Sequence, residues 1–165
     1  MVEHHSKING FLWAHKNRNI LNNNRPVLSM LTNLEHLGLA VPDLAAATAL
    51  YTKLLGTAPY KTEHVASEAV DTVFFQVGGS KIELLAGTSP DSAITKFLEK
   101  KPAGIHHVAF EVDDIVAEMA RLRAEGFVLL NEAPKRGADN KLVCFVHPKS
   151  AGGVLVELCQ SVAAV

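Results

Sequence analysis

The chain has few cysteines, almost no net charge and no long apolar run, and each absence excludes a class of protein. Two cysteines, Cys144 and Cys159, cannot build a disulfide framework, so we expect a reducing compartment, the cytoplasm. The mitochondrial matrix is the weaker expectation, because residues 1–30 hold only two Arg and two Ser, few for a transit peptide. A net charge of -1 argues against non-specific binding of nucleic acid, because proteins that bind in this way usually carry a surplus of basic residues. No apolar run reaches the roughly 18 residues of a transmembrane helix, so no membrane partner is expected.

The remaining composition is typical of a folded globular protein. The 165 residues are 48% hydrophobic and 20% charged, which suits one domain with its own core. Residues 1–30 differ from the rest because they are rich in Asn and lack a hydrophobic period. We therefore predict a disordered N-terminal extension over residues 1–30 and a single folded domain over residues 31–160.

The folded part of the chain repeats itself once. Residues 34–44 and 105–115 are similar apolar segments, and each leads through an aspartate, Asp43 or Asp114, into a helical pattern. The aspartates suit helix N-caps, and a glycine later ends each helical pattern. A Gly-Gly turn followed by another apolar strand closes both copies, which indicates a terminal hairpin in each.

The pattern in each copy predicts a β-α-β-β-β module. We therefore expect an α+β fold in which two paired modules form an open, barrel-like cup. Module 1 covers about residues 31–87, a linker with a short helix covers residues 88–103, and module 2 covers about residues 104–160. The strand that follows each long helix is expected near residues 58–65 and 127–132.

Four polar residues interrupt the apolar strands at equivalent places in the two copies. His36 and His107 lie in the first strands, and Glu83 and Glu157 lie in the last strands. One of them alone could simply face solvent, because side chains alternate along a strand; the same alternation predicts that His106 faces away from His107. If first and last strands are neighbours and the modules meet about a pseudo-twofold axis, the four side chains converge. Two imidazoles and two carboxylates suit one divalent ion such as Co, Mn, Ni or Zn, so the cup is predicted to bind a metal.

In these motifs the chain resembles the vicinal oxygen chelate superfamily and, within it, the methylmalonyl-CoA epimerase family. The resemblance covers about residues 31–160. It is carried by segments 35–44, 81–85, 104–110 and 153–158, by the His-Pro-Lys-Ser block at 147–150 and by the linker at 89–97. It implies the metal ligands His36, Glu83, His107 and Glu157, an acyl-CoA thioester substrate, a homodimer, and inversion at the α-carbon of methylmalonyl-CoA through a metal-stabilised enolate.

Such an inversion removes a proton from one face of a carbon and delivers it to the other. Glu157 is the expected acid/base on one face. Some members of the family carry a second glutamate on the middle strand, where this chain has Thr72. We therefore expect Glu83 to serve the other face, with a water near Thr72 as the alternative relay. Two further substrate contacts are expected, Lys149 in the His-Pro-Lys-Ser block and Asn140 in a loop that could cover the site.

Two other functions stay open at this point. A glyoxalase I-type enzyme, acting on a glutathione hemithioacetal, would use the same four metal ligands and an enolate-like intermediate. A non-catalytic small-molecule-binding member of the superfamily would need no metal ligands, so the presence of two His and two Glu argues against it.

Overall fold

The computed structural model describes residues 31–162, so the extension predicted over residues 1–30 lies outside the described residues. Within residues 31–162 lie two short 3-10 helices, η1 (Ala66–Glu68) and η2 (Pro148–Ser150). The strands and α-helices, in chain order, are β1 (Leu31–Ala40), α1 (Leu44–Leu55), β2 (Lys61–Val65), β3 (Val70–Val77), β4 (Ser80–Gly87), α2 (Ala93–Leu98), β5 (Gly104–Val112), α3 (Ile115–Ala124), β6 (Lys135–Arg136), β7 (Lys141–Val146) and β8 (Val156–Ser161).

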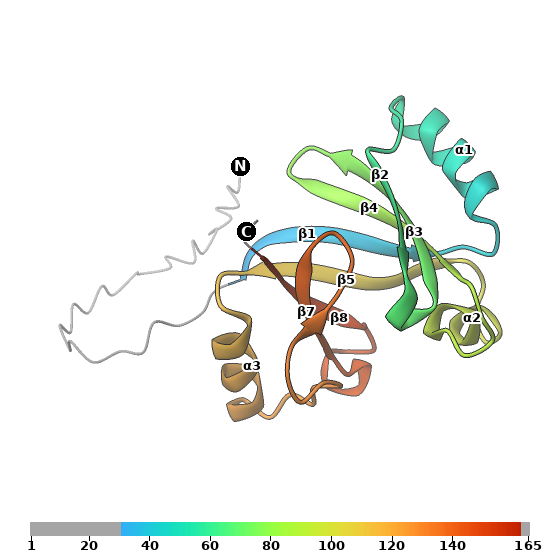
Figure 1. Ribbon diagram of the computed structural model, residues 1–165. Helices are drawn as coiled ribbons and strands as arrows, with labels where there is room; N and C mark the ends of the chain where they lie inside the picture. The colour runs from blue at the N-terminus through green and yellow to red at the C-terminus, as the bar shows by residue number, and fades with distance from the viewer. Residues whose placement is uncertain (1–30, 163–165) are drawn as a thin grey trace, which may run out of the picture.

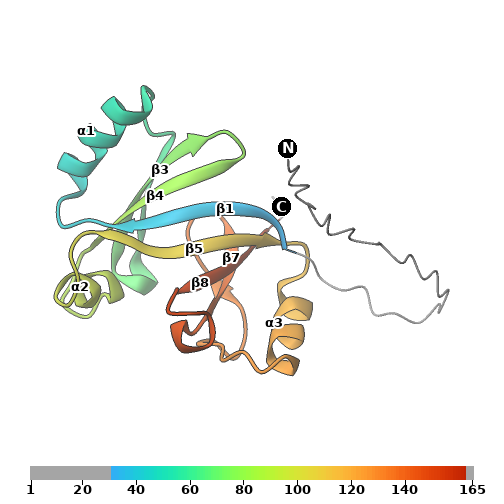
Figure 2. The same cartoon turned by 180° about the vertical axis from the view of Figure 1, so that it is seen from behind.

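The strands form one 8-stranded sheet in the order β2-β3-β4-β1-β5-β8-β7-β6. At its centre β1 and β5 pair antiparallel, and in each module the first strand pairs parallel with the last, β1 with β4 and β5 with β8. β1 and β5 cross the middle of the molecule, with β2–β4 and α1 on one side and β7, β8 and α3 on the other (Figures 1 and 2). The predicted α+β fold of two paired β-α-β-β-β modules is confirmed.

The long helices begin where the sequence indicates. The Asp43 side chain accepts a hydrogen bond from the Ala46 amide at the start of α1, and Asp114 caps α3 in the same way. Gly56 ends α1 with a left-handed φ of 67°, a conformation that glycine adopts at less cost than other residues. Within residues 31–162, no helix is long and apolar enough to cross a membrane.

The curled sheet presents its outer face to α1 and α3, whereas its inner face lines a cavity, with Ile94 of α2 packed at one end of it. The faces under the helices hold the main apolar cores, in module 1 Leu39, Val41, Val73, Phe75 and Leu84, and in module 2 Val112, Ile115, Met119, Leu122, Cys144, Val146 and Leu158. Because side chains alternate along a strand, the residues between these point to the opposite face. The four polar residues predicted as metal ligands lie on that inner face.

The second strand of module 2 differs from the prediction. Instead of a strand over residues 127–132, the sheet ends in the two-residue strand β6, and Leu129 forms only an isolated bridge with Val146. The side-chain oxygen of Asn131 accepts the hydrogen bond of the Phe145 amide, with 2.9 Å between N and O, where a strand would use a backbone carbonyl. The side chain thus ends the ladder, and the chain pairs with β7 again only at β6.

Candidate metal centre and substrate cavity

A cavity of about 390 Å³ lies on the inner face of the curled sheet. Both modules and the loop before β7 build its wall, which combines apolar side chains with a few charged ones. A largely apolar cavity with a small number of convergent polar groups is the usual form of a small-molecule site. Its wall includes five residues with predicted roles, His36, Thr72, Glu83, His107 and Glu157.

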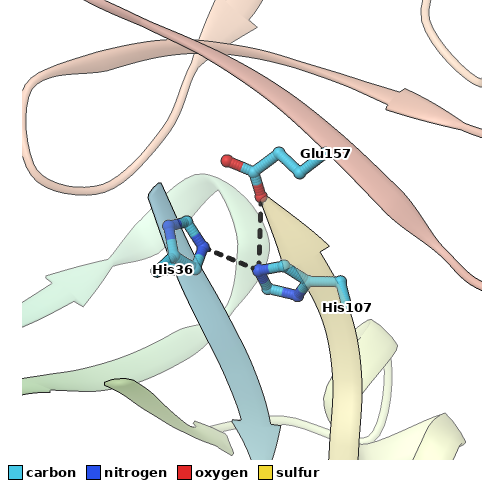
Figure 3. A group of neighbouring side chains, drawn as sticks. All are labelled: His36, His107 and Glu157. Carbon is cyan, nitrogen blue, oxygen red and sulfur yellow. Dashed lines mark hydrogen bonds and ion pairs between the residues drawn. The ribbon is translucent and has the colours of Figure 1, made fainter. Parts of the chain in front are cut away.

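The structure brings the four predicted ligand side chains together. His36 Nε2 and His107 Nε2 are 2.8 Å apart. Glu83 Oε2 lies 3.2 Å from His36 Nε2 and 3.6 Å from His107 Nε2. Glu157 Oε2 lies 3.4 Å from His107 Nε2 (Figure 3). Ligand atoms of His36, His107 and Glu157 all lie within 4.8 Å of one another, which is close enough for one shared ion.

This donor set fits a divalent metal ion. In both histidines, Nδ1 contacts the residue that precedes the histidine in the chain: Glu35 Oε2 is 2.5 Å from His36 Nδ1, and His106 Nδ1 is 3.0 Å from His107 Nδ1. Both rings therefore turn Nε2 toward the cluster, and a partner at Nδ1 is the usual support of a metal-binding imidazole. A cation would also balance the two buried carboxylates, which are costly to bury without a partner.

β-bulges explain how consecutive residues reach the same side of a strand. The pairing of β1 with β5 shifts register twice near the site, so that Glu35 is an extra residue on β1 and His106 is an extra residue on β5. An extra residue interrupts the alternation and re-aims a side chain. The expectation that His106 faces away from His107 is therefore wrong, because His106 lines the same cavity.

Glu35 holds a charged network that the sequence analysis missed. Its carboxylate pairs with Lys81 and, at 3.1 Å, with Lys141. Lys81 Nζ also lies 2.6 Å from Asp139 Oδ2, so the loop before β7 is tied to β4 and, through Glu35, to the His36 ring. Burial alone raises the pKa of Glu35, but hydrogen bonds to His36 and Lys81 hold that pKa well below its usual value. The available signal was a polar residue before the histidine in both copies of the repeat.

The two carboxyls predicted to exchange protons lie in different electrostatic settings. Burial raises the pKa of Glu157, and the nearby histidines only partly offset it. Burial acts in the same direction on Glu83, but hydrogen bonds from His107 and His36 outweigh it and lower the pKa to about 2. For His36 the hydrogen bonds to Glu35 and Glu83 overcome burial and raise the pKa to about 10. Neighbouring carboxyls with divergent pKa values are typical of groups with different acid/base roles.

Gly38 makes room for the His107 ring. It lies on β1 opposite His107 on β5 and beside Glu83 on β4. A Cβ atom at Gly38 would lie 2.6 Å from both ring nitrogens of His107, closer than real Cβ contacts allow. The equivalent position in the other module, opposite His36, carries Ala109, so this close approach belongs to one module only.

Gly38→Ala is expected to lower the affinity for a divalent metal by about 10- to 100-fold, the usual effect of disturbing the support of a metal ligand. The added methyl group would push the His107 ring out of the cluster. The metal content that remains after dialysis against graded chelator concentrations measures the affinity for the metal. Gly79→Ala is the matched control, because a Cβ there meets nothing within 4 Å. Equal affinities in the two variants would contradict the expectation.

The three predicted substrate contacts lie in different places. Thr72 is 1% exposed and lines the cavity from β3. Lys149 is exposed in η2 and does not line the cavity. The Asn140 side chain also lies outside the lining, and it binds Arg136 and the backbone carbonyl of Val162. The cavity therefore gives no support to a substrate contact by Lys149 or Asn140. Among residues 31–162, the lysine and arginine side chains that line the cavity are Lys135, Arg136 and Lys141.

Comparison with known proteins connects this geometry to a family. Residues 35–145 match the model of the Glyoxalase/Bleomycin resistance protein/Dioxygenase superfamily. Over 133 residues the chain is 44% identical to a protein of Cereibacter sphaeroides named ethylmalonyl-CoA/methylmalonyl-CoA epimerase, and the match covers 79% of this chain and 99% of the relative.

Two solved structures with a similar fold also belong to proteins named methylmalonyl-CoA epimerase. A methylmalonyl-CoA epimerase in complex with methylmalonyl-CoA and NH4+ matches with a TM-score of 0.78 at 35% identity, over 81% of this chain and 97% of that chain. A variant of the Streptomyces coelicolor methylmalonyl-CoA epimerase in complex with 2-nitronate-propionyl-CoA matches with a TM-score of 0.78 at 35% identity, over 81% of this chain and 100% of that chain.

Proposed function

Because the chain belongs to the Glyoxalase/Bleomycin resistance protein/Dioxygenase superfamily, we propose that it is a metal-dependent epimerase that interconverts (R)- and (S)-methylmalonyl-CoA. The observation that carries the proposal is the convergence of His36, Glu83, His107 and Glu157 in one buried cluster on a cavity wall. The names of the relatives supply the substrate class, an acyl-CoA thioester. A homodimer and a cytoplasmic location stay predictions.

We propose that one divalent ion, such as Co, Mn, Ni or Zn, is held by the two imidazole Nε2 atoms and the two carboxylates. When bound, the ion supplies a Lewis acid that stabilises the negative charge developing on the thioester oxygen as the α-proton leaves. The chain contributes a cluster whose rings are already oriented, because Glu35 and His106 engage the Nδ1 atoms. Such preorganisation avoids the cost of arranging the site during the reaction.

Glu157 is the proposed acid/base on one face of the α-carbon. It lines the cavity, and its closest contact to a histidine, 3.4 Å to His107 Nε2, leaves it the less engaged of the two carboxylates. Glu83, which comes from the other module, is the proposed acid/base on the opposite face. A free threonine hydroxyl is too weak a base near neutral pH, so Thr72 could contribute only by holding a water that relays the proton.

The cavity suits the acyl part of the substrate. Its volume of about 390 Å³ falls within the range of small-molecule sites, and apolar wall residues such as Phe74 and Val143 can receive the methyl group. Lys135 and Arg136 lie at the strand that closes the cavity wall and can pair with the CoA phosphates. We therefore place the reacting group inside the cavity and the nucleotide outside it.

The test is exchange of the C2 hydrogen of methylmalonyl-CoA in deuterated water. The metal-loaded protein is expected to incorporate deuterium while it interconverts the two epimers, because both events pass through the same enolate. Chelation should stop both, and added divalent ion should restore both. Turnover of methylglyoxal with glutathione, without exchange of methylmalonyl-CoA, would indicate a glyoxalase I-type enzyme. Binding of the thioester without exchange in the metal-loaded protein would indicate a non-catalytic binding protein.

A further inference from the structure

Glu35 and His106 occupy equivalent positions in the repeat, yet only Glu35 is fully engaged. Each is an extra residue of its strand, and each contacts Nδ1 of the predicted metal ligand that follows it. The other oxygen of Glu35 binds Lys81 and Lys141. His106 has a second ring nitrogen, Nε2, for which residues 31–162 provide no hydrogen-bond partner.

Packing holds the His106 ring against the cavity. The Phe97 ring of α2 meets it edge to face, with ring centroids 5.0 Å apart and planes at 85°. The His107 ring lies on another side, with a centroid distance of 5.3 Å. His106 lines the same cavity as Glu83 and Glu157. The nitrogen without a protein partner thus belongs to an oriented ring that borders the space for a ligand.

The hydrogen bond between the two histidines decides which nitrogen of His106 carries hydrogen. His107 turns Nε2 toward Glu83 and Glu157, so as a metal ligand it must carry its hydrogen on Nδ1. That Nδ1 then donates to Nδ1 of His106 across 3.0 Å. A His106 ring that accepts at Nδ1 carries its own hydrogen on Nε2, the nitrogen that lacks a protein partner.

We propose that His106 contacts the substrate and donates a hydrogen bond from Nε2 to an oxygen of the malonyl thioester group. This inference rests on the proposed function. The thioester oxygen becomes negative as the α-proton leaves, and a preorganised donor at such an oxygen lowers the barrier. Glu35 cannot play this part in module 1, because a carboxylate has no hydrogen to donate and its oxygens already bind His36 and two lysines. Of these two equivalent positions in the repeat, only that of His106 therefore carries a hydrogen-bond donor.

His106→Asn and His106→Gln form a matched pair that separates donation to substrate from support of His107. Asn places its amide near the position of Nδ1, so its carbonyl oxygen can still accept from His107 while the donor at Nε2 is lost. Gln places its amide near the position of Nε2 and restores an N–H there. For both variants, bound metal and the visible spectrum of the Co(II)-loaded protein report the ligand geometry independently of turnover.

The Asn variant is expected to keep its metal and its Co(II) spectrum, while kcat for epimerisation falls by about 10- to 100-fold, as for loss of a hydrogen bond to a charged acceptor. Its affinity for 2-nitronate-propionyl-CoA should fall as well, and the Gln variant should recover most of both losses. Wild-type kcat and affinity in the Asn variant would overturn the proposal. Loss of metal from that variant would overturn it too, because His106 would then act through His107 alone. Failure of the wild-type protein to epimerise methylmalonyl-CoA would instead refute the proposed function, and the affinity measurement would still decide whether His106 contacts the ligand.

Discussion

Replacing His107 with alanine is expected to remove the metal ion and the epimerase activity together. His107 Nε2 lies within 3.6 Å of Glu83, His36 and Glu157, so among the four proposed ligands it is the one that joins the others. Without it three protein ligands remain, and the Lewis-acid stabilisation of several kcal/mol is lost with the ion. Since each 1.4 kcal/mol is a factor of ten, the rate should fall by about 10³-fold or more.

Metal content after dialysis and the rate of deuterium incorporation at C2 measure the two expected losses. His64→Ala is the matched control, because the His64 side chain is 57% exposed and pairs with Asp71 away from the cavity. The control should keep both metal and activity. A His107→Ala protein with full metal occupancy would remove His107 from the ligand set.

Glu157→Gln is expected to lower the epimerisation rate by about 10²- to 10⁴-fold, the usual contribution of a general acid/base, while the metal stays bound. The amide oxygen of glutamine can still coordinate an ion, but the side chain can no longer accept a proton. Glu125→Gln, on the exposed end of α3, is the control for the same chemical change outside the site. Epimerisation at the wild-type rate in Glu157→Gln would exclude Glu157 as a base.

The partner variant Glu83→Gln decides between the two candidates for the second face. If Glu83 exchanges a proton, each variant should still exchange the α-hydrogen of one epimer with deuterium but no longer convert it into the other epimer. If Glu83 is only a ligand, Glu83→Gln should epimerise within about tenfold of the wild-type rate, or about 1.4 kcal/mol of barrier. Thr72→Glu, which places a carboxylate on the cavity wall, should then raise the rate.

The internal repeat made the fold and the polar cluster predictable from local pattern. A His in the first strand and a Glu in the last strand of each copy are unusual in apolar segments, and two copies of one pattern are expected to share one fold. The parallel pairing of β1 with β4 and of β5 with β8 then places each His next to its Glu. The caps at Asp43 and Asp114 were predictable for the same reason, because capping depends on residues within one turn of the helix.

Long-range pairing decided the features that local pattern could not predict. Alternation along a strand places His106 away from His107, but in the register between β1 and β5 Glu35 and His106 are extra residues, and both turn toward the cavity. The prediction of a strand over residues 127–132 was wrong for a similar reason. The Asn131 side chain accepts a hydrogen bond from the amide of Phe145, a residue of β7 outside the local segment.

The amino-acid sequence by itself therefore determined the two modules, the helix ends and the identity of the four clustered His and Glu residues, since all of these follow from periodicity and from a pattern that occurs twice. Only the tertiary structure decided the supports of the cluster. The fit of Gly38 against His107, the ion pairs that join Glu35 to the loop at Asp139, and the cavity-facing ring of His106 all depend on contacts between segments far apart in the chain. No local rule sets the register of one strand against another, and here that register aims the side chains that support the proposed metal ligands.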